Sequence, residues 1–314
     1  MRFSLRIAVR ALSRKALVLA SSVITPHKRP GVRCPCRRID PPSVELTSVN
    51  DAAAFVKALR DPSKYHRKRK IELTFLGTRG EIKARSRRHR RHSALLVRRG
   101  RARIMIDCGT DWLKAFAKIA PTAIVLTHAH DDHAAGLASG ASYPVYATQE
   151  TWTAIARFPI EDARVVEARV PFKIGGVSFE AFDVEHSLRA PAVGYRIDEG
   201  GSSLFYVPDV AAICEPHAAL DGVCLYIGDG ATVTRSMVRR RDHALIGHAP
   251  IVAQLGWCAE EGVARAIFTH CGSGIVESDA RKIAARVADL GKTHGIEATI
   301  AYDGLALTLP RRSR

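Results

Sequence analysis

The feature that most constrains this chain is a cluster of potential metal ligands directly after a short apolar run. Residues 123–126, Ala-Ile-Val-Leu, are predicted to form a buried strand, and Thr-His-Ala-His-Asp-Asp-His follows at residues 127–133. Four ligand-type side chains therefore fall within six residues: His128, His130, Asp132 and His133. Imidazole and carboxylate groups at the end of a strand, where coordination positions stay open, are typical of a catalytic zinc site.

The pattern H-x-H-x-D-H resembles the signature of the metallo-β-lactamase superfamily. Residues 71–78 alternate as a strand and end in Phe-Leu-Gly-Thr, which is similar to the opening strand of ribonuclease Z-like members. The resemblance covers residues 71–309. It implies an α/β fold in which two mixed sheets pack together and helices cover both outer faces, the αββα sandwich.

The other motifs of this superfamily can be placed residue by residue. Predicted strands at residues 177–186, 204–209 and 266–270 end in a histidine, an aspartate and a histidine. The resemblance implies two divalent metal ions per chain, Zn²⁺ or alternatively Mn²⁺. One ion would be held by His128, His130 and His186, the other by Asp132, His133 and His270, and Asp209 would be shared by both.

Asp107 ends a further predicted strand, residues 103–107. In the family this aspartate is not a ligand, and it forms hydrogen bonds behind the ligands that orient their imidazoles.

The predicted chemistry follows from two ions that share one water. Such a pair lowers the pKa of the water towards neutrality, so that a bridging hydroxide becomes the nucleophile. Cleavage of an ester also requires a proton for the departing oxygen. The resemblance to ribonuclease Z and to the cyclic phosphodiesterase of the phosphonate pathway implies that His248 is this general acid. Asp132 is counted as catalytic as well as a ligand.

The remaining histidines are interpreted as surface residues. They are His27, His66, His89, His92, His217, His243 and His294.

Positive charge is concentrated in the first third of the chain. Of the 314 residues, the first 100 contain 26 Lys and Arg against six Asp and Glu, a net charge of +20, whereas the remainder carries −3. This asymmetry indicates a basic arm and loop attached to a nearly neutral catalytic body. Within the basic loop, residues 83–92, we expect Arg87, Arg88, Arg90 and Arg91 to bind an anionic substrate.

Three segments are expected along the chain. Residues 1–48 are predicted to be a basic, disordered extension, residues 49–70 a helix and basic linker, and residues 71–314 the catalytic domain. Helices are predicted within the domain at residues 111–117, 149–157 and 251–261. No apolar run is long enough to span a membrane, and seven scattered cysteines favour a cytoplasmic protein with reduced thiols.

The leading hypothesis is a dinuclear metal phosphodiesterase that acts on a phosphodiester, for example a nucleotide or nucleic acid, and a homodimer is a further hypothesis. One alternative is a hydrolase of carboxylic esters, lactones or thioesters, which would need neither His248 nor the basic loop. The other is a protein that binds or processes nucleic acid through its basic first third. Complete ligands argue against this last hypothesis, because an inactive site usually loses some of them.

Overall fold

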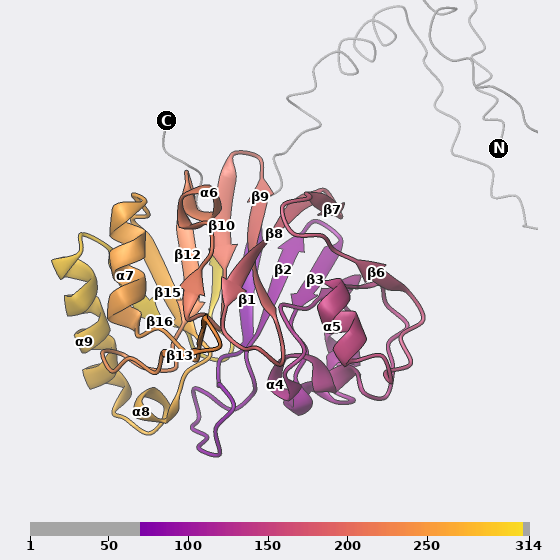
Figure 1. Ribbon diagram of the computed structural model, residues 1–314, viewed down its shortest axis with the longest axis horizontal. Coiled ribbons are helices and arrows are strands. Elements are labelled where there is room, and N and C mark those ends of the chain that lie inside the picture. Colours follow the sequence, from indigo (N-terminus) through magenta and orange to yellow (C-terminus); the bar gives the residue numbers. More distant parts are fainter. Residues whose placement is uncertain (1–69, 310–314) are drawn as a thin grey trace, which may run out of the picture. The chain divides into compact units, whose positions relative to one another are not determined.

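The computed structural model describes residues 70–309, and the predictions for residues 1–69 lie outside this range. Two large sheets form the centre of the described body (Figure 1). The first has the order β17 (Ala306–Thr308), β1 (Glu72–Gly77), β2 (Ala94–Arg99), β3 (Ala102–Ile106), β4 (Ala123–Val125), β5 (Val145–Ala147) and β6 (Ala163–Val165). The second has the order β11 (Ala212–Ile213), β8 (Val177–Glu185), β9 (Ala192–Glu199), β10 (Ser202–Tyr206), β12 (Leu225–Asp229), β15 (Arg265–Thr269) and β16 (Glu297–Ile300), and β7 (Phe172–Ile174) pairs with β8.

Each sheet combines antiparallel and parallel strands. Strands β1 to β3 and β8 to β10 pair antiparallel, whereas β3 to β6 and the β10-β12-β15-β16 series pair parallel. Parallel strands need crossover connections, which place helices on the face of a sheet. Figure 1 shows α7 (Ile251–Glu260) and α9 (Ala280–Thr293) on one side of the body, and α4 (Asp131–Ala134) and α5 (Gln149–Ala154) on the other.

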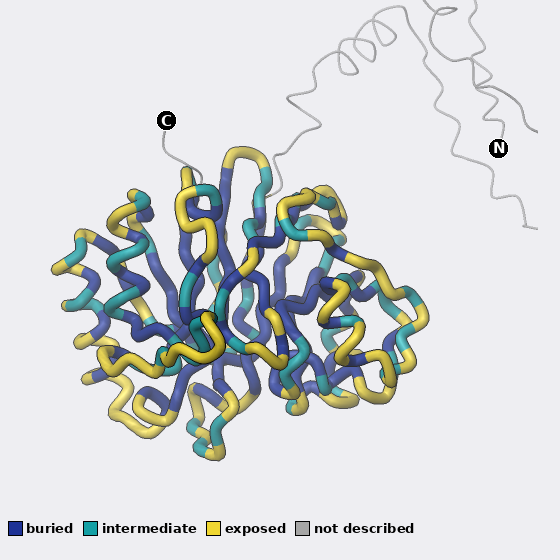
Figure 2. Tube along the Cα trace, in the orientation of Figure 1, coloured by how far each residue is buried: buried dark blue, intermediate teal, exposed yellow. Residues whose placement is uncertain are grey.

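Three hydrophobic clusters correspond to the three interfaces between these layers. Within β10, Leu204 belongs to the cluster between the sheets and Phe205 to the cluster beneath α7 and α9. The third cluster packs Met105 of β3 against Trp112 and Leu137. The central strands are therefore apolar on both faces, and Figure 2 shows them as the buried part of the body. The predicted αββα sandwich is confirmed.

The remaining elements are short. They are α6 (Pro216–Leu220), α8 (Ser273–Val276), the hairpin of β13 (Arg239–Arg241) and β14 (Ala244–Ile246), and three 3₁₀ helices at Thr110–Trp112, Phe116–Ile119 and Ala135–Leu137.

The helix predicted at residues 111–117 is wrong. Two 3₁₀ helices, Thr110–Trp112 and Phe116–Ile119, stand there instead. Lys114 lies between them with a φ of +60°, a left-handed conformation that a continuous right-handed helix cannot contain.

The described residues contain no helix that is both long enough and apolar enough to cross a membrane.

Candidate metal centre

Strand ends bring the predicted ligands to one edge of the two sheets. His186 directly follows β8, His270 directly follows β15, and Asp209 lies three residues beyond β10. The segment after β4 supplies the other four, with Asp132 and His133 on the short helix α4. Helix α4 packs so closely on the loop after β3 that a Cβ at Gly109 would lie 1.7 Å from the carbonyl oxygen of Asp132. Only glycine fits that position.

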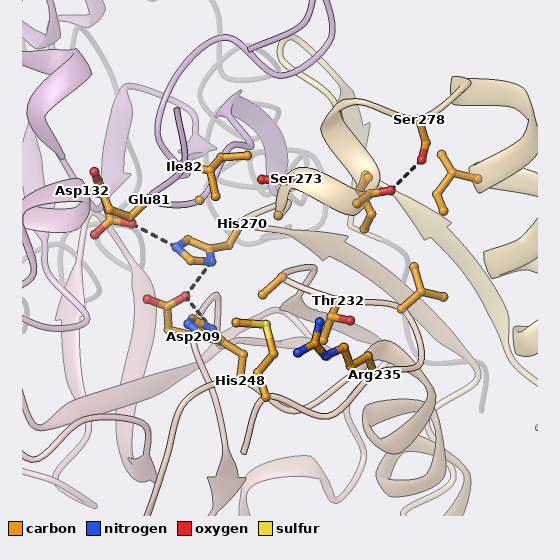
Figure 3. A pocket seen from close by; sticks show the side chains of 18 of the residues that line it. Glu81, Ile82, Asp132, Asp209, Thr232, Arg235, His248, His270, Ser273 and Ser278 are labelled. Carbon is orange, nitrogen blue, oxygen red and sulfur yellow. Dashed lines mark hydrogen bonds and ion pairs between the residues drawn. The ribbon is translucent and has the colours of Figure 1, made fainter. Parts of the chain in front are cut away.

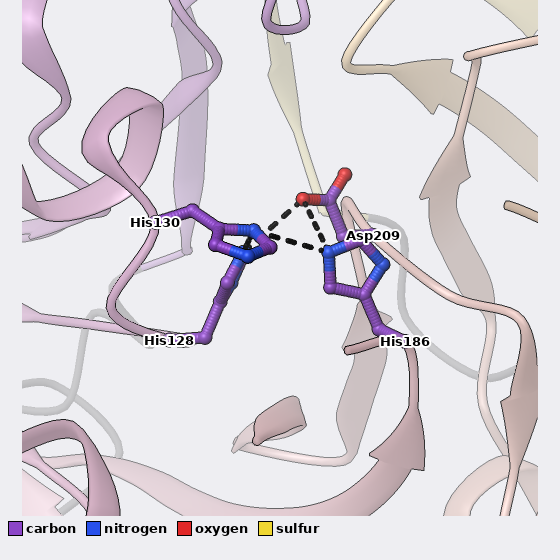
Figure 4. A group of neighbouring side chains, drawn as sticks. All are labelled: His128, His130, His186 and Asp209. Carbon is purple, nitrogen blue, oxygen red and sulfur yellow. Dashed lines mark hydrogen bonds and ion pairs between the residues drawn. The ribbon is translucent and has the colours of Figure 1, made fainter. Parts of the chain in front are cut away.

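Four side chains converge in the first ligand cluster, which consists of His128, His130, His186 and Asp209 (Figure 4). His130 Nδ1 lies 3.0 Å from His128 Nε2 and 3.3 Å from His186 Nε2. Asp209 Oδ2 lies 3.3 Å from His128 Nε2 and 3.5 Å from His186 Nε2. The ring nitrogens and the carboxylate oxygen thus face a common centre.

The second cluster consists of Asp132, His133, Asp209 and His270, and it shares Asp209 with the first. Asp132 Oδ2 lies 3.3 Å from His133 Nε2 and 3.0 Å from His270 Nε2. Asp209 Oδ1 lies 2.8 Å from His270 Nδ1. The structure therefore brings together all seven side chains that the sequence singled out.

Asp107 lies behind these clusters and is completely buried. Its carboxylate accepts hydrogen bonds from the backbone and hydroxyl of Thr127 and from His133 Nδ1, at 2.8–2.9 Å. A proton on Nδ1 leaves the Nε2 lone pair of His133 directed at the second cluster. Asp107 and His270 both have positive φ, +62° and +51°, which places backbone strain beside the site.

The charges and polar atoms of the site fit divalent cations. Burial lowers the pKa of His128, His130 and His186, to about 4 for His130, so that these rings are neutral and can donate lone pairs. His133 Nε2, His270 Nδ1 and Asp209 Oδ1 are buried and have no hydrogen-bond partner of proper geometry among the described residues. A metal site requires buried nitrogen and oxygen atoms whose lone pairs are not used in hydrogen bonds and face one centre.

The second cluster attracts positive charge. Burial opposes a charge on His270, yet the carboxylates of Asp209 and Asp132 outweigh it and raise its pKa to about 10. The same carboxylates raise the pKa of His133 in spite of its burial. Protons on these rings would be released when a cation takes their place.

His248 lies beside the ligands and forms a pair with Asp229. Its Nδ1 is 2.8 Å from Asp229 Oδ2 and 3.8 Å from Asp209 Oδ1. His248 lies three positions before Ile251, the first residue of α7, and so does not open the helix, whose N-cap is Pro250. Burial lowers the pKa of His248, but the Asp229 carboxylate outweighs this effect and raises the pKa above its ordinary value. A third possible ligand group consists of Asp209, Asp229, His248 and His270.

Asp229 is a site residue that the sequence reasoning missed. It is the last residue of β12, it is completely buried, and its carboxylate also accepts from the backbone N–H groups of Val210 and Ala231. The sequence signal that could have identified Asp229 is its position at the end of a predicted strand, which it shares with Asp209.

The clusters open into a pocket of about 920 Å³ (Figure 3). His130, Asp132, His186, Asp209, His248 and His270 all line it. The same pocket continues along residues 231–235 and 272–275 to Arg286 on α9. A cavity of this size can hold a small organic molecule in addition to metal ions.

The basic loop lies outside this pocket lining. Arg87, Arg88, Arg90 and Arg91 are exposed. Arg88 stacks on the ring of Tyr302 and Arg91 on that of Trp112, at 4.1 and 4.5 Å from the ring centres. The arginines that do line the pocket are Arg235 and Arg286.

The surface interpretation of His89 and His92 is wrong. Both side chains are buried, because the basic loop folds back onto the body. His89 Nδ1 lies 2.8 Å from the Thr78 hydroxyl, and His92 Nδ1 lies 3.5 Å from Asp111 Oδ2. Burial lowers the pKa of each ring to about 4. His217 and His243 are exposed as expected, and His294 is half-buried.

This geometry agrees with comparisons to known proteins. Residues 102–271, more than half of the chain, match the β-lactamase superfamily domain. The chain therefore belongs to the β-lactamase superfamily.

A curated relative is ribonuclease Z of Methanopyrus kandleri, 29% identical over 147 residues. The match covers 41% of this chain and 51% of the relative, so the chain spans about half the length of this protein.

Two solved structures share the fold. The metallo-β-lactamase fold protein YhfI from Bacillus subtilis superposes with a TM-score of 0.60 and 17% identity, over 77% of this chain and 100% of that one. A diphosphatase from the PhnP family gives a TM-score of 0.60 and 19% identity, over 76% of this chain and 97% of that one. At these identities the likeness concerns the fold.

Proposed function

We propose that this protein is a dinuclear metal-dependent phosphodiesterase in which His248 is the general acid. The observation that carries the proposal is the His248–Asp229 pair, in which His248 lines the pocket and its Nδ1 lies 3.8 Å from Oδ1 of Asp209. The raised pKa of His248 favours its protonated form, which is the state that a proton donor needs before the bond breaks.

The seven ligand side chains would hold two divalent cations, with His128, His130 and His186 on one side, Asp132, His133 and His270 on the other, and Asp209 between them. Bound there, Zn²⁺ or Mn²⁺ would lower the pKa of a water towards neutrality and polarise the phosphoryl oxygens. Asp107 holds a proton on Nδ1 of His133, which leaves Nε2 free to bind a cation. Asp229 likewise holds a proton on Nδ1 of His248. His248 then protonates the departing oxygen.

The choice of a phosphodiester depends on the leaving group. An alkoxide that departs from phosphorus is strongly basic, so a positioned acid contributes about 10²–10⁴ to the rate. The names of the relatives, a ribonuclease and a diphosphatase, support phosphoryl chemistry. The alternative is a carboxylic ester, lactone or thioester hydrolase, for which a buried acid–histidine pair outside the ligand set has no evident task.

The test is a substrate comparison with metal-loaded protein. Bis(p-nitrophenyl) phosphate, a lactone and a thioester are assayed after loading with Zn²⁺ or Mn²⁺, and Asp209→Ala serves as the control that lacks the shared ligand. We expect turnover of the diester above the other two, and none by the control. Preferred turnover of the lactone or thioester would contradict the proposal.

A further inference from the structure

The pocket beyond the metal centre is divided by charge. The acidic residues Glu81 and Asp131 line it near Asp132, a proposed ligand that lines it as well. Arg235 and Arg286 are the only Lys or Arg side chains among the lining residues, and they lie with the 231–235 segment and α9. A substrate that enters this pocket therefore meets cationic side chains in addition to the proposed ligands.

Both arginines are available to an anion. Arg286 donates from Nη2 to the Thr234 hydroxyl at 3.0 Å, which ties α9 to the loop that carries Arg235. Neither guanidinium forms an ion pair with a carboxylate of residues 70–309. Figure 3 shows Arg235 beside Thr232, with its guanidinium on the side that faces His248. A guanidinium presents a planar set of donors that matches phosphate oxygens.

The lining between the two ends suits a ring system. The apolar residues Val233, Ile275 and Ile283 and the hydroxyl residues Thr232 and Ser273 also line the pocket. The volume of about 920 Å³ lies near the upper end of the range for small-ligand sites. The pocket can thus hold a substrate that extends well beyond one phosphodiester.

We infer that Arg235 and Arg286 form a second phosphate-binding subsite, which selects phosphodiesters that carry a further terminal phosphate, such as short phosphorylated oligonucleotides. The inference rests on the proposed function, because it assumes that the reacting diester occupies the metal centre. The diester lies at the ligands, the intervening nucleoside lies against the apolar lining, and the terminal phosphate contacts the arginines.

The experiment compares three forms of one dinucleotide, without a terminal phosphate, with a 5′-phosphate, and with a 3′-phosphate. For the metal-loaded wild type we expect kcat/KM for one phosphorylated form to exceed that for the unphosphorylated form by about tenfold to a hundredfold, because hydrogen bonds to charged groups are strong. In Arg235→Gln/Arg286→Gln this preference falls to near one.

A matched control removes the same charge from neighbouring positions. Arg239 on β13 and Arg281 on α9 are exposed and do not line the pocket. Arg239→Gln/Arg281→Gln should therefore keep the wild-type preference. Equal loss of preference in both double variants, or no preference in the wild type, would overturn the inference.

A binding measurement separates this inference from the proposed function. Chelator-treated protein is titrated calorimetrically with the same three dinucleotides, so that no turnover is required. Tighter binding of a phosphorylated form that depends on Arg235 and Arg286 supports the subsite even if no diester is hydrolysed. Diester hydrolysis without any dependence of binding or preference on these arginines rejects the subsite and leaves the phosphodiesterase proposal standing.

Discussion

His248 Nδ1 lies 2.8 Å from Asp229 Oδ2, and this contact orients the ring and raises its pKa. The carboxylate is itself held by the backbone N–H groups of Val210 and Ala231, so it cannot follow the ring if the ring moves. Because Nδ1 is hydrogen-bonded to the Asp229 carboxylate, Nε2 is the ring nitrogen that can contact a substrate. The pair thus links strand β12 to the reacting end of the pocket.

The first prediction concerns His248→Ala. We expect this variant to keep its metal ions, because the residue is outside the proposed ligand set, and to lose about 10²–10⁴ in rate on a substrate with an alkoxide leaving group. A p-nitrophenyl diester needs little protonation and should be spared much of this loss. Turnover of both substrates and metal content by elemental analysis check it.

His243→Ala supplies the control for this experiment, since His243 is exposed and five residues away in the chain. Its effect should be mild. Loss of metal from His248→Ala would instead assign His248 to the third possible ligand group.

The second prediction concerns the pH dependence of Asp229→Asn. Asp229 raises the pKa of His248, so its neutralisation should lower that pKa. A general acid works only while protonated, and the rate falls as pH rises through its pKa. The alkaline limb of the pH–kcat profile should therefore move to lower pH, with metal content unchanged. An unshifted limb would show that Asp229 does not control the proton on His248.

The fold could be predicted from the sequence, and the seven proposed ligands could be named, because the motifs that carry the family resemblance are local patterns. A ligand at the end of an apolar strand, as at His186 or His270, is visible without knowledge of the tertiary structure. The role of Asp229 was not visible, because it depends on β12 lying next to β15 and on the loop before α7 returning to the same edge.

Long-range packing also explains the errors. His89 and His92 lie in a run of arginines that reads as a solvated loop. Asp303 and Asp111 bond the backbone of this loop and draw it onto the body, which buries both rings. The two arginines of the pocket lining were missed for the same reason, since Arg235 and Arg286 are 51 positions apart in the numbering and only the fold brings Arg286 to Thr234, the neighbour of Arg235.

The third prediction concerns the basic loop. Neutralising Arg87, Arg88, Arg90 and Arg91 together should weaken the binding of a nucleic-acid substrate and flatten its salt dependence, by about one unit of slope for each lost phosphate contact. A small diester should respond far less. Affinities measured over a range of salt concentrations test this, and equal responses of both substrates would contradict it.

A sharper variant separates charge from packing in this loop. Arg88 and Arg91 also stack on Tyr302 and Trp112, whereas Arg87 and Arg90 make no ring contact in the described structure. Arg87→Gln/Arg90→Gln should therefore reduce the salt slope without lowering the melting temperature.

The fourth prediction concerns stability and pH. Burial, together with the charge of Arg88, lowers the pKa of His89 from 6.5 to about 4. Between these values the unfolded chain binds a proton that the folded protein does not, so the free energy of unfolding decreases as pH falls from 6.5 to 4. His89→Gln should lessen this decrease, by at most about 3 kcal/mol. Urea unfolding of chelator-treated wild type and variant at several pH values measures this difference. Curves of unfolding free energy against pH that run parallel for the two proteins would contradict the lowered pKa of His89.

We propose that seven side chains hold two metal ions and that the carboxylate of Asp209 is shared between them. Elemental analysis of wild type and Asp209→Ala, after exposure to Zn²⁺ and removal of the excess, tests this most directly. We expect close to two ions per wild-type chain, because seven ligands exceed what one tetrahedral ion can use, and loss of metal from the variant. A wild-type protein that takes up no metal, or a variant that retains both ions, would contradict it.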